Sequence, residues 1–200
     1  MNSERGNIRY SFVNYFKFLA FIMPHVIVFF FILQSIFSQN LKVIFYLAGL
    51  LFMNIALNVI KSSVPIIDGH PVCTIFNSGL EFIDIPSNSV STLAYTMMYL
   101  LFPMVFFNVI NIGAITSMIL LISFVIYFQM EYKCITGMGA FLGISIGVLV
   151  GLLMALFTAS VNRDYLYFSE YISDKVACSV PDKQTFRCNV YKGQELIGQF

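Results

Sequence analysis

Three segments of this chain place residues that could do chemistry beside long apolar runs. The first runs from Lys61 to Pro71 and contains the cationic Lys61 and also His70, whose imidazole could act as a base. The second, Pro86-Ser87-Asn88-Ser89, supplies hydroxyl groups just before an apolar run. Its Ser or Asn can also cap the first amides of the helix that follows. The third, from Tyr132 to Gly147, joins Lys133 to a series of glycines.

The order of these segments resembles that of the type 2 phosphatidic acid phosphatase superfamily, which includes the lipid phosphate phosphatases. That family has Lys-x6-Arg-Pro, then Pro-Ser-Gly-His opening a helix, then Ser-Arg-x5-His-x3-Asp before a glycine-rich final helix. Here Asp68 stands at the Arg of the first motif, and Ser89 stands at the acid His of the second. In the third motif Lys133 stands at the Arg, Gly139 at the nucleophilic His and Gly143 at its Asp partner.

The resemblance implies a helical lipid-phosphatase-like scaffold that lacks the catalytic groups. Serine and glycine at these positions cannot supply the nucleophile and the acid that the family chemistry needs. The resemblance also implies contacts with a phosphate or lipid head group, made by the polar residues Lys61, His70, Ser87, Ser89 and Lys133. We therefore expect binding rather than catalysis, and the alternative is a lipid phosphate phosphatase with atypical residues.

The composition is that of an integral membrane protein. Of the 200 residues, 58% are hydrophobic and only 10% are charged, whereas about a quarter are charged in a soluble protein. Asp, Glu, Lys and Arg are absent from residues 18–41, 43–60, 85–130 and 134–162. A helix needs about 20 apolar residues to cross a bilayer, so the 85–130 stretch is long enough for two. The sequence predicts an all-α integral membrane protein with about five transmembrane helices in a bundle and a small soluble C-terminal tail.

The predicted organisation is an interfacial arm over residues 1–17, a transmembrane helical domain over 18–160 and a soluble tail over 161–200. The spans are expected at 18–37, 43–60, 91–110, 115–128 and 135–159. Pro24 and Pro103 predict kinks, and residues 108–113 predict a tight turn between the third and fourth spans. In the tail, residues 186–191 and 195–200 are predicted to form two strands joined by a turn.

A few polar residues lie inside the predicted spans. His25 is either a functional residue or a hydrogen-bonded neutral side chain, and the second interpretation is favoured near a membrane end. Asn54 and Asn58 are four residues apart and share one helical face. We expect this face to look into the bundle and to bond neighbouring helices, with a ligand site as the alternative.

Small residues recur at every fourth position of the last span, namely Gly139, Gly143, Gly147, Gly151, Ala155 and Ala159. Such a row lets two helix backbones approach closely, which matters in lipid because apolar burial no longer drives association. The row turns by about 40° at each step. We therefore predict that it packs against two partner helices.

The remaining sequence features concern the cysteines, cofactors and partners. Cys178 and Cys188 flank a Pro-Asp pair in the tail and are a candidate disulfide. The cysteines have no metal-site spacing, so we expect neither a metal nor a cofactor. The chain has no basic patch, which argues against nucleic acid as a partner. The expected partners are membrane lipids and other protein subunits.

The orientation prediction rests on basic residues near the ends of the spans. Five lie on the N-terminal face, Arg5, Arg9, Lys17, Lys61 and Lys133, and two lie on the other face, Lys42 and Arg163. The positive-inside rule then places the N-terminus in the cytosol and the tail on the opposite side. The resembled family argues for the reverse, because its active-site loops face away from the cytosol, and we prefer the charge rule.

The predicted function is that of a noncatalytic multi-span membrane protein. It would serve as a structural subunit of a larger membrane assembly, such as a virion or organelle complex, or as a lipid-head-group binder. A small transporter or channel is the alternative from another class. No predicted span contains a carboxylate or Arg, which ion pathways commonly use, and this argues against transport of ions.

Overall fold

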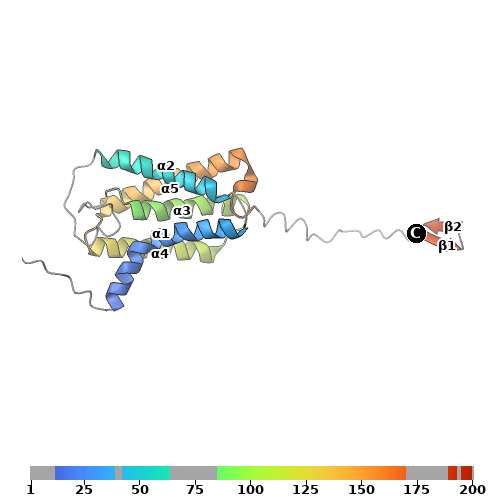
Figure 1. The fold of residues 1–200 in the computed structure, drawn as a ribbon, viewed down its shortest axis with the longest axis horizontal. Helices are drawn as coiled ribbons and strands as arrows, with labels where there is room; N and C mark the ends of the chain where they lie inside the picture. Colours follow the sequence, from blue (N-terminus) through green and yellow to red (C-terminus); the bar gives the residue numbers. More distant parts are fainter. Residues whose placement is uncertain (1–11, 39–41, 64–84, 170–188, 193–194, 200) are drawn as a thin grey trace, which may run out of the picture.

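The residues that the structure describes form a bundle of five long helices followed by a small hairpin (Figure 1). The computed structural model describes residues 12–38, 42–63, 85–169, 189–192 and 195–199. All five helices are long and apolar enough to cross a membrane, which confirms the predicted fold class. Their bounds are α1 Phe12–Ser38, α2 Lys42–Lys61, α3 Asn88–Phe106, α4 Ile112–Glu131 and α5 Gly137–Val161.

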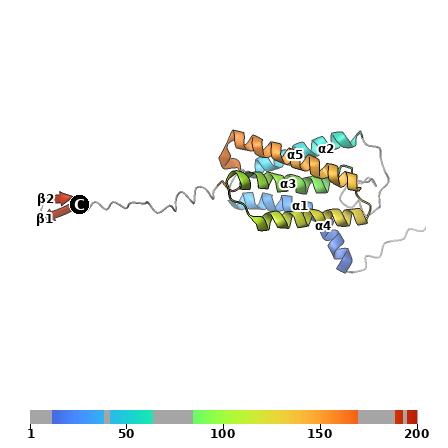
Figure 2. The ribbon, with the colours of Figure 1, turned by 180° about the vertical axis from the view of Figure 1, so that it is seen from behind.

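Helix α3 lies at the centre of the bundle and contacts each of the other four helices. Helices α2 and α5 lie on one side of it, and α1 and α4 lie on the other (Figures 1 and 2). Helices α2 and α4 finish at the same end of the bundle where α3 and α5 begin. We call this the Ser87 end, because Ser87 lies there and its backbone N–H donates to the carbonyl of Gly139 at 3.2 Å.

The predicted row of small residues packs α5 directly on α3. A methyl group added to Gly147 would lie 2.9 Å from the Cβ of Ala94, and one added to Gly151 would lie 2.8 Å from the carbonyl oxygen of Tyr95. Gly143 meets the start of α3 in the same way. Helix α5 also contacts α2, so it has the two partner helices that were predicted. The glycines themselves, however, face α3.

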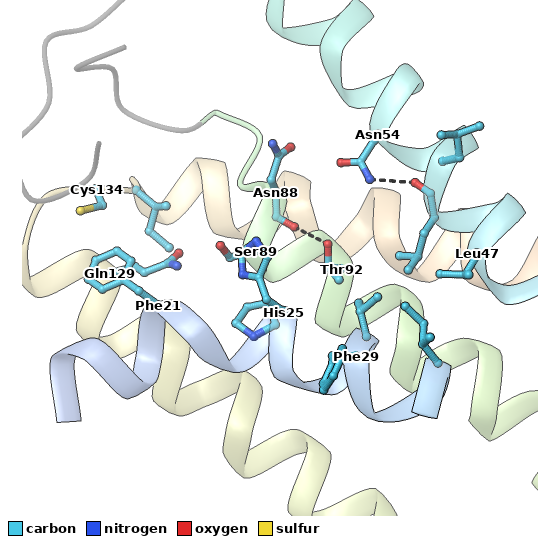
Figure 3. A pocket seen from close by; sticks show the side chains of 16 residues that line it. Phe21, His25, Phe29, Leu47, Asn54, Asn88, Ser89, Thr92, Gln129 and Cys134 are labelled. Atoms are coloured by element: carbon cyan, nitrogen blue, oxygen red, sulfur yellow. Dashed lines mark hydrogen bonds between the residues drawn. The ribbon is translucent and has the colours of Figure 1, made fainter. Parts of the chain in front are cut away.

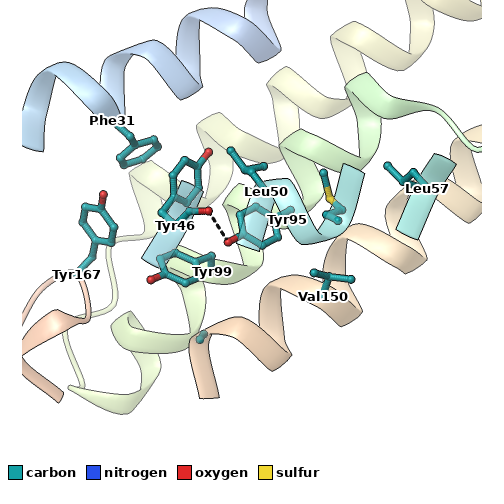
Figure 4. Packing of buried hydrophobic residues seen from close by; sticks show 10 residues of the cluster. Phe31, Tyr46, Leu50, Leu57, Tyr95, Tyr99, Val150 and Tyr167 are labelled. Carbon is teal, nitrogen blue, oxygen red and sulfur yellow. Dashed lines mark hydrogen bonds between the residues drawn. The ribbon is translucent and has the colours of Figure 1, made fainter. Parts of the chain in front are cut away.

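A cluster of tyrosines fills the half of the bundle away from the Ser87 end (Figure 4). The ring centroid of Tyr46 lies 5.5 Å from that of Tyr95 and 5.6 Å from that of Tyr99. The Tyr95 hydroxyl donates to the carbonyl of Tyr46 at 2.9 Å, and the Tyr46 hydroxyl is 2.7 Å from that of Thr96. Bonds of this kind are required because an unpaired polar group is costly in hydrocarbon. The sequence pattern does not predict this cluster.

The turn between α3 and α4 is built by two asparagines. Helix α3 ends at Phe106, three residues after Pro103 and four before the predicted end. Asn108 adopts a left-handed conformation with φ 54°, which asparagine tolerates better than most residues. Asn111 caps α4 by accepting the backbone N–H of Ala114 at 3.1 Å.

The other predicted details are confirmed in part. Gly113, expected in that turn, lies in the first turn of α4. Helix α1 changes direction within its N-terminal half, which contains Pro24 (Figure 1). In the tail, strands β1 Asn189–Lys192 and β2 Glu195–Gln199 pair antiparallel, as the pattern predicts.

The chain continues to pack on the bundle after α5. A short 3-10 helix, η2 Arg163–Tyr165, turns the chain back, and Leu166 beyond it is fully buried. The ring of Tyr167 packs edge-on against that of Phe31, with the two ring centroids 5.5 Å apart. The Lys42 ammonium donates to the Ser169 hydroxyl at 3.0 Å. Residues 163–169 therefore pack against the helical bundle.

Candidate functional site: a cavity between α1 and α2

A cavity of about 610 Å³ lies between α1 and α2 and reaches inward to α3 (Figure 3). This volume is within the range of about 300–1,000 Å³ that is typical of small-molecule sites. Most of its wall is apolar and includes Phe21, Val28 and Ile32 of α1 and Leu47, Leu50 and Leu51 of α2. The α1 side alone extends over roughly 16 Å from Phe21 to Ile32, at 1.5 Å per residue. The cavity is therefore long enough to hold an extended apolar chain.

One end of the cavity is polar. Asn88, Ser89 and Thr92 line it from the first turns of α3, Gln129 from the end of α4 and His25 from α1 (Figure 3). The Thr92 hydroxyl donates to the Asn88 carbonyl at 2.9 Å, which ties up its proton within the helix. Ser89 and Gln129 are then the side chains best placed to meet a ligand.

Gln129 is held in place by the turn that follows α4. Its backbone carbonyl accepts the N–H groups of Cys134 at 2.9 Å and Ile135 at 3.4 Å. Its side-chain oxygen accepts the Ser87 hydroxyl at 3.4 Å, and the residue is only 3% exposed. The side-chain nitrogen makes no hydrogen bond within the described part of the chain, while the side chain lines the cavity. Gln129 therefore presents a fixed amide donor to the cavity.

Ser87 and Ser89 have different surroundings although they are two residues apart. Ser87 is fully buried and caps α3, since its hydroxyl accepts the N–H of Val90 at 3.4 Å. Ser89 is half-buried and lines the cavity, and its hydroxyl has no hydrogen-bond partner among the residues that the structure describes. Ser87 is thus a structural residue, whereas Ser89 is available to a ligand.

The cavity opens sideways, toward the surroundings of the bundle. The most exposed residues of its wall are His25 and Phe29 of α1 and Leu51 and Asn54 of α2. These two helices therefore border the opening. In a bilayer such an opening faces lipid, so an apolar molecule would reach the cavity without passing through water.

The described residues that line the cavity include no Asp, Glu, Lys or Arg. A phosphate in a buried site is normally held by Arg or Lys, and an unpaired buried charge is strongly disfavoured. Among the described residues there is also no group of three or more His, Cys, Asp or Glu that could hold a metal ion. The site as described suits an uncharged ligand.

The residues predicted from the sequence are distributed around this site. Of the five predicted head-group residues, Ser89 lines the cavity, and Ser87 donates a hydrogen bond to the side chain of Gln129. Lys61 is the partly exposed last residue of α2, and Lys133 is exposed in the turn before α5. Neither lysine lines the cavity. His70, like Cys178 and Cys188, lies outside the described residues.

Two residues of the polar end were missed or undervalued from the sequence. Gln129 was not singled out, although it is the only Asn or Gln among residues 112–161. His25 was interpreted as structural, but it lines the cavity. The favoured prediction for the asparagines of α2, bonds to neighbouring helices inside the bundle, is wrong, because both are exposed and Asn54 bonds the carbonyl of Leu50 in its own helix at 2.9 Å. Asn54 does line the cavity, in line with the alternative of a ligand site.

The second and third segments of the family resemblance do lie side by side. Gly139 accepts the backbone N–H of Ser87, and a side chain at Gly143 would meet the Ser87 carbonyl at 3.0 Å. The contact between Ser87, Gly139 and Gly143 is therefore made by backbone groups and small side chains, and none of the three residues is an acid or a base. Comparisons with protein-family models, with curated proteins and with solved structures found no match for this chain.

Proposed function

We propose that this chain is a noncatalytic membrane protein that binds an uncharged lipid in the cavity between α1 and α2. One observation carries the proposal: a long apolar cavity, open between two helices, ends in fixed hydrogen-bonding groups and is lined by no charged residue among those described. An amphiphile with one acyl chain and a neutral head matches this distribution. Its chain would lie along Val28, Ile32 and Leu47, and its head would lie at Ser89 and Gln129.

The head group that fits best carries carbonyl and hydroxyl oxygens. The amide of Gln129 needs an acceptor, and the Ser89 hydroxyl can both donate and accept. A buried donor left unpaired costs about 1–3 kcal/mol, so a ligand carbonyl at Gln129 would contribute appreciably to binding. Glycerol esters such as monoacylglycerol have these groups and no charge. A phosphate monoester would need a cation that the described lining does not provide.

The lipid-phosphatase-like scaffold remains part of the proposal, as the origin of the arrangement. Its support is the contact between the starts of α3 and α5, which brings the family positions Ser89, Gly139 and Gly143 to the same end of the bundle. The residues at those positions cannot act as nucleophile, orienting carboxylate and acid. The absence of these groups favours binding over phosphate ester hydrolysis.

A role as a structural subunit of a larger assembly stays a prediction. Residues 170–188 of the predicted tail lie outside the described residues. A neutral-lipid transporter is compatible with the same cavity, and it would bind the same class of ligand. A binding test therefore addresses the property that both alternatives share.

Photolabelling would test the proposal with two probes that differ only in a phosphate group on the glycerol head. Purified full-length protein in nanodiscs is exposed to monoacylglycerol or to lysophosphatidic acid with the same diazirine-bearing acyl chain. We expect labelling by the neutral probe to be at least about tenfold stronger, with labelled peptides from α1 and α2. The factor corresponds to about 1.4 kcal/mol, within the range for one buried hydrogen bond.

A matched pair of variants locates the site. Leu51→Trp should obstruct the cavity opening, whereas Leu153→Trp adds the same side chain to an exposed position of α5 that does not line the cavity. Loss of neutral-lipid labelling in Leu51→Trp alone supports the proposal. Equal labelling by the two probes, or equal labelling of both variants and wild type, would contradict it.

The orientation of the bundle is a separate part of the proposal. The basic residues predict a cytosolic N-terminus, and the family resemblance implies the reverse. The five helices fit either orientation. To choose between the two orientations, one needs a structural feature that forms in the compartment on one side of the membrane and not in the other.

A further inference from the structure

Cys134 supplies such a feature, because it is disulfide-bonded. It lies in the turn between α4 and α5, is only 4% exposed and lines the cavity beside Gln129 (Figure 3). Its backbone N–H is bonded to the Gln129 carbonyl at 2.9 Å, so the residue is fixed at the Ser87 end. The chain has four cysteines, and the other three, Cys73, Cys178 and Cys188, lie outside the described residues.

Topology decides which of the three can be the partner within one molecule. Cys178 and Cys188 follow α5, which starts at the Ser87 end and crosses to the opposite end. The membrane therefore separates them from Cys134. Cys73 belongs to the segment that joins the end of α2 to the start of α3, and both of those helix ends lie at the Ser87 end. Cys73 is the cysteine on the same side of the membrane.

We infer that Cys134 is paired with Cys73 and that the Ser87 end of the bundle faces an oxidising compartment. Disulfides persist in the endoplasmic reticulum lumen, the periplasm and outside the cell, and they are rare in the cytosol. Bond formation removes two electrons and two protons from the two thiols. A disulfide-carrying oxidoreductase of that compartment accepts them by thiol–disulfide exchange.

This orientation is the reverse of the one predicted from the basic residues. That prediction rests on five basic residues near the span ends on one face against two on the other. The rule behind it is a statistical bias in membrane insertion. A disulfide is a chemical consequence of the compartment, so we give it more weight. It follows that the tail lies in the cytosol and that Cys178 and Cys188 are thiols, instead of the disulfide expected from their spacing.

The inference also bears on the proposed ligand, and in this respect it rests on the proposed function. The polar end of the cavity lies at the Ser87 end, so the lipid head would sit on the oxidising side of the membrane. The ligand would then come from the leaflet that faces away from the cytosol.

Mass spectrometry of the wild-type chain tests the pairing without any variant. Membranes are treated with N-ethylmaleimide during lysis, and the protein is digested without reduction. We expect a cross-linked peptide that contains Cys73 and Cys134, together with alkylated Cys178 and Cys188. Alkylated Cys134, a Cys178–Cys188 cross-link or a bond between two copies of Cys134 would each overturn the inference.

Thiol labelling in sealed microsomes tests the orientation separately. Lys133→Cys and Ser160→Cys are made in a cysteine-free background, because both positions are exposed and lie at opposite ends of the bundle. An impermeant maleimide should label Ser160→Cys in intact vesicles and Lys133→Cys only after permeabilisation. The opposite result would overturn the orientation. Neither experiment involves a lipid ligand, so their failure is distinguishable from a failure of the binding proposal.

Discussion

At the scale of single residues, the start of α3 separates a structural hydroxyl from a ligand-facing one. Ser87 caps α3, donates to Gln129 and bonds the α5 backbone through its own N–H. Ser89, two residues further along the chain, lines the cavity, and its hydroxyl bonds none of the described residues. Replacing each by alanine removes the same atom, so any difference between the two variants reports their surroundings.

The two alanine variants should therefore have opposite effects. Ser87→Ala removes a helix cap and should lower the free energy of unfolding by about 1–2 kcal/mol, measured by denaturant titration in detergent. Ser89→Ala should leave stability within about 0.5 kcal/mol of wild type and should weaken neutral-lipid labelling. If Ser89→Ala destabilised the protein as much as Ser87→Ala, the distinction would be wrong.

The sequence was informative about Ser89 and uninformative about Gln129 for a physical reason. Ser89 stands in a segment with a recognisable order of residues, and this order is enough to mark it as a candidate. Gln129 acquires its role from a tertiary contact: the turn at Cys134 and the Ser87 hydroxyl hold its side chain against the cavity. The sequence alone does not show which side chain such a turn will hold in place.

At the scale of elements, the contact between α3 and α5 was the most predictable feature of the bundle. A four-residue repeat of glycine has one physical use in lipid, the close approach of two backbones. The partner could not be deduced, because every helix in the chain is apolar enough to receive it. The structure identifies α3, whose Ala94 and Tyr95 backbone meet the Gly147 position.

Two glycine substitutions on α5 should show that this contact holds the bundle together. An alanine Cβ at Gly147 would collide with the Ser91 carbonyl and with Ala94, whereas one at Gly137 would meet only the end of the Met130 side chain at 3.9 Å. We expect Gly147→Ala to lower the free energy of unfolding by about 1–3 kcal/mol. Gly137→Ala should be neutral or slightly stabilising. Equal stability of the two variants would mean that α3 and α5 can separate without loss.

Span positions were predictable because hydrocarbon forbids unpaired backbone and buried charge. Each of the five predicted spans overlaps one helix, and the errors occur at the ends, as at α3, which ends at Phe106. The tyrosine cluster could not be predicted, because helical spacing does not reveal which tyrosines of three elements will meet. Tyr46, Tyr99 and Tyr167 belong to α2, α3 and the segment after α5.

At the scale of the whole molecule, the two ends of the bundle are built differently. The polar end of the cavity lies at the Ser87 end, whereas the opposite end is closed by aromatic packing. Tyr167 completes this packing from outside the spans, and its burial raises the pKa of its hydroxyl above the ordinary value. The rings of Phe45 and Tyr165 stack with their centroids 5.1 Å apart. The segment after α5 therefore acts as part of the helical unit rather than as the start of a separate tail.

Truncation of the chain at two points should locate the end of this unit. A chain that ends at residue 169 keeps Leu166, Tyr167 and the bond from Lys42 to Ser169. A chain that ends at residue 162 loses all of these and exposes the rings that Tyr167 covers. We expect the shorter chain to be less stable by about 2–4 kcal/mol, the loss of two buried side chains, in denaturant titrations of both proteins in the same detergent. Because both lack residues 170–200, the difference reports residues 163–169 alone. Equal stability would place the boundary at the end of α5, where composition had put it, and would mean that the aromatic packing seen at this end contributes nothing to holding the bundle closed.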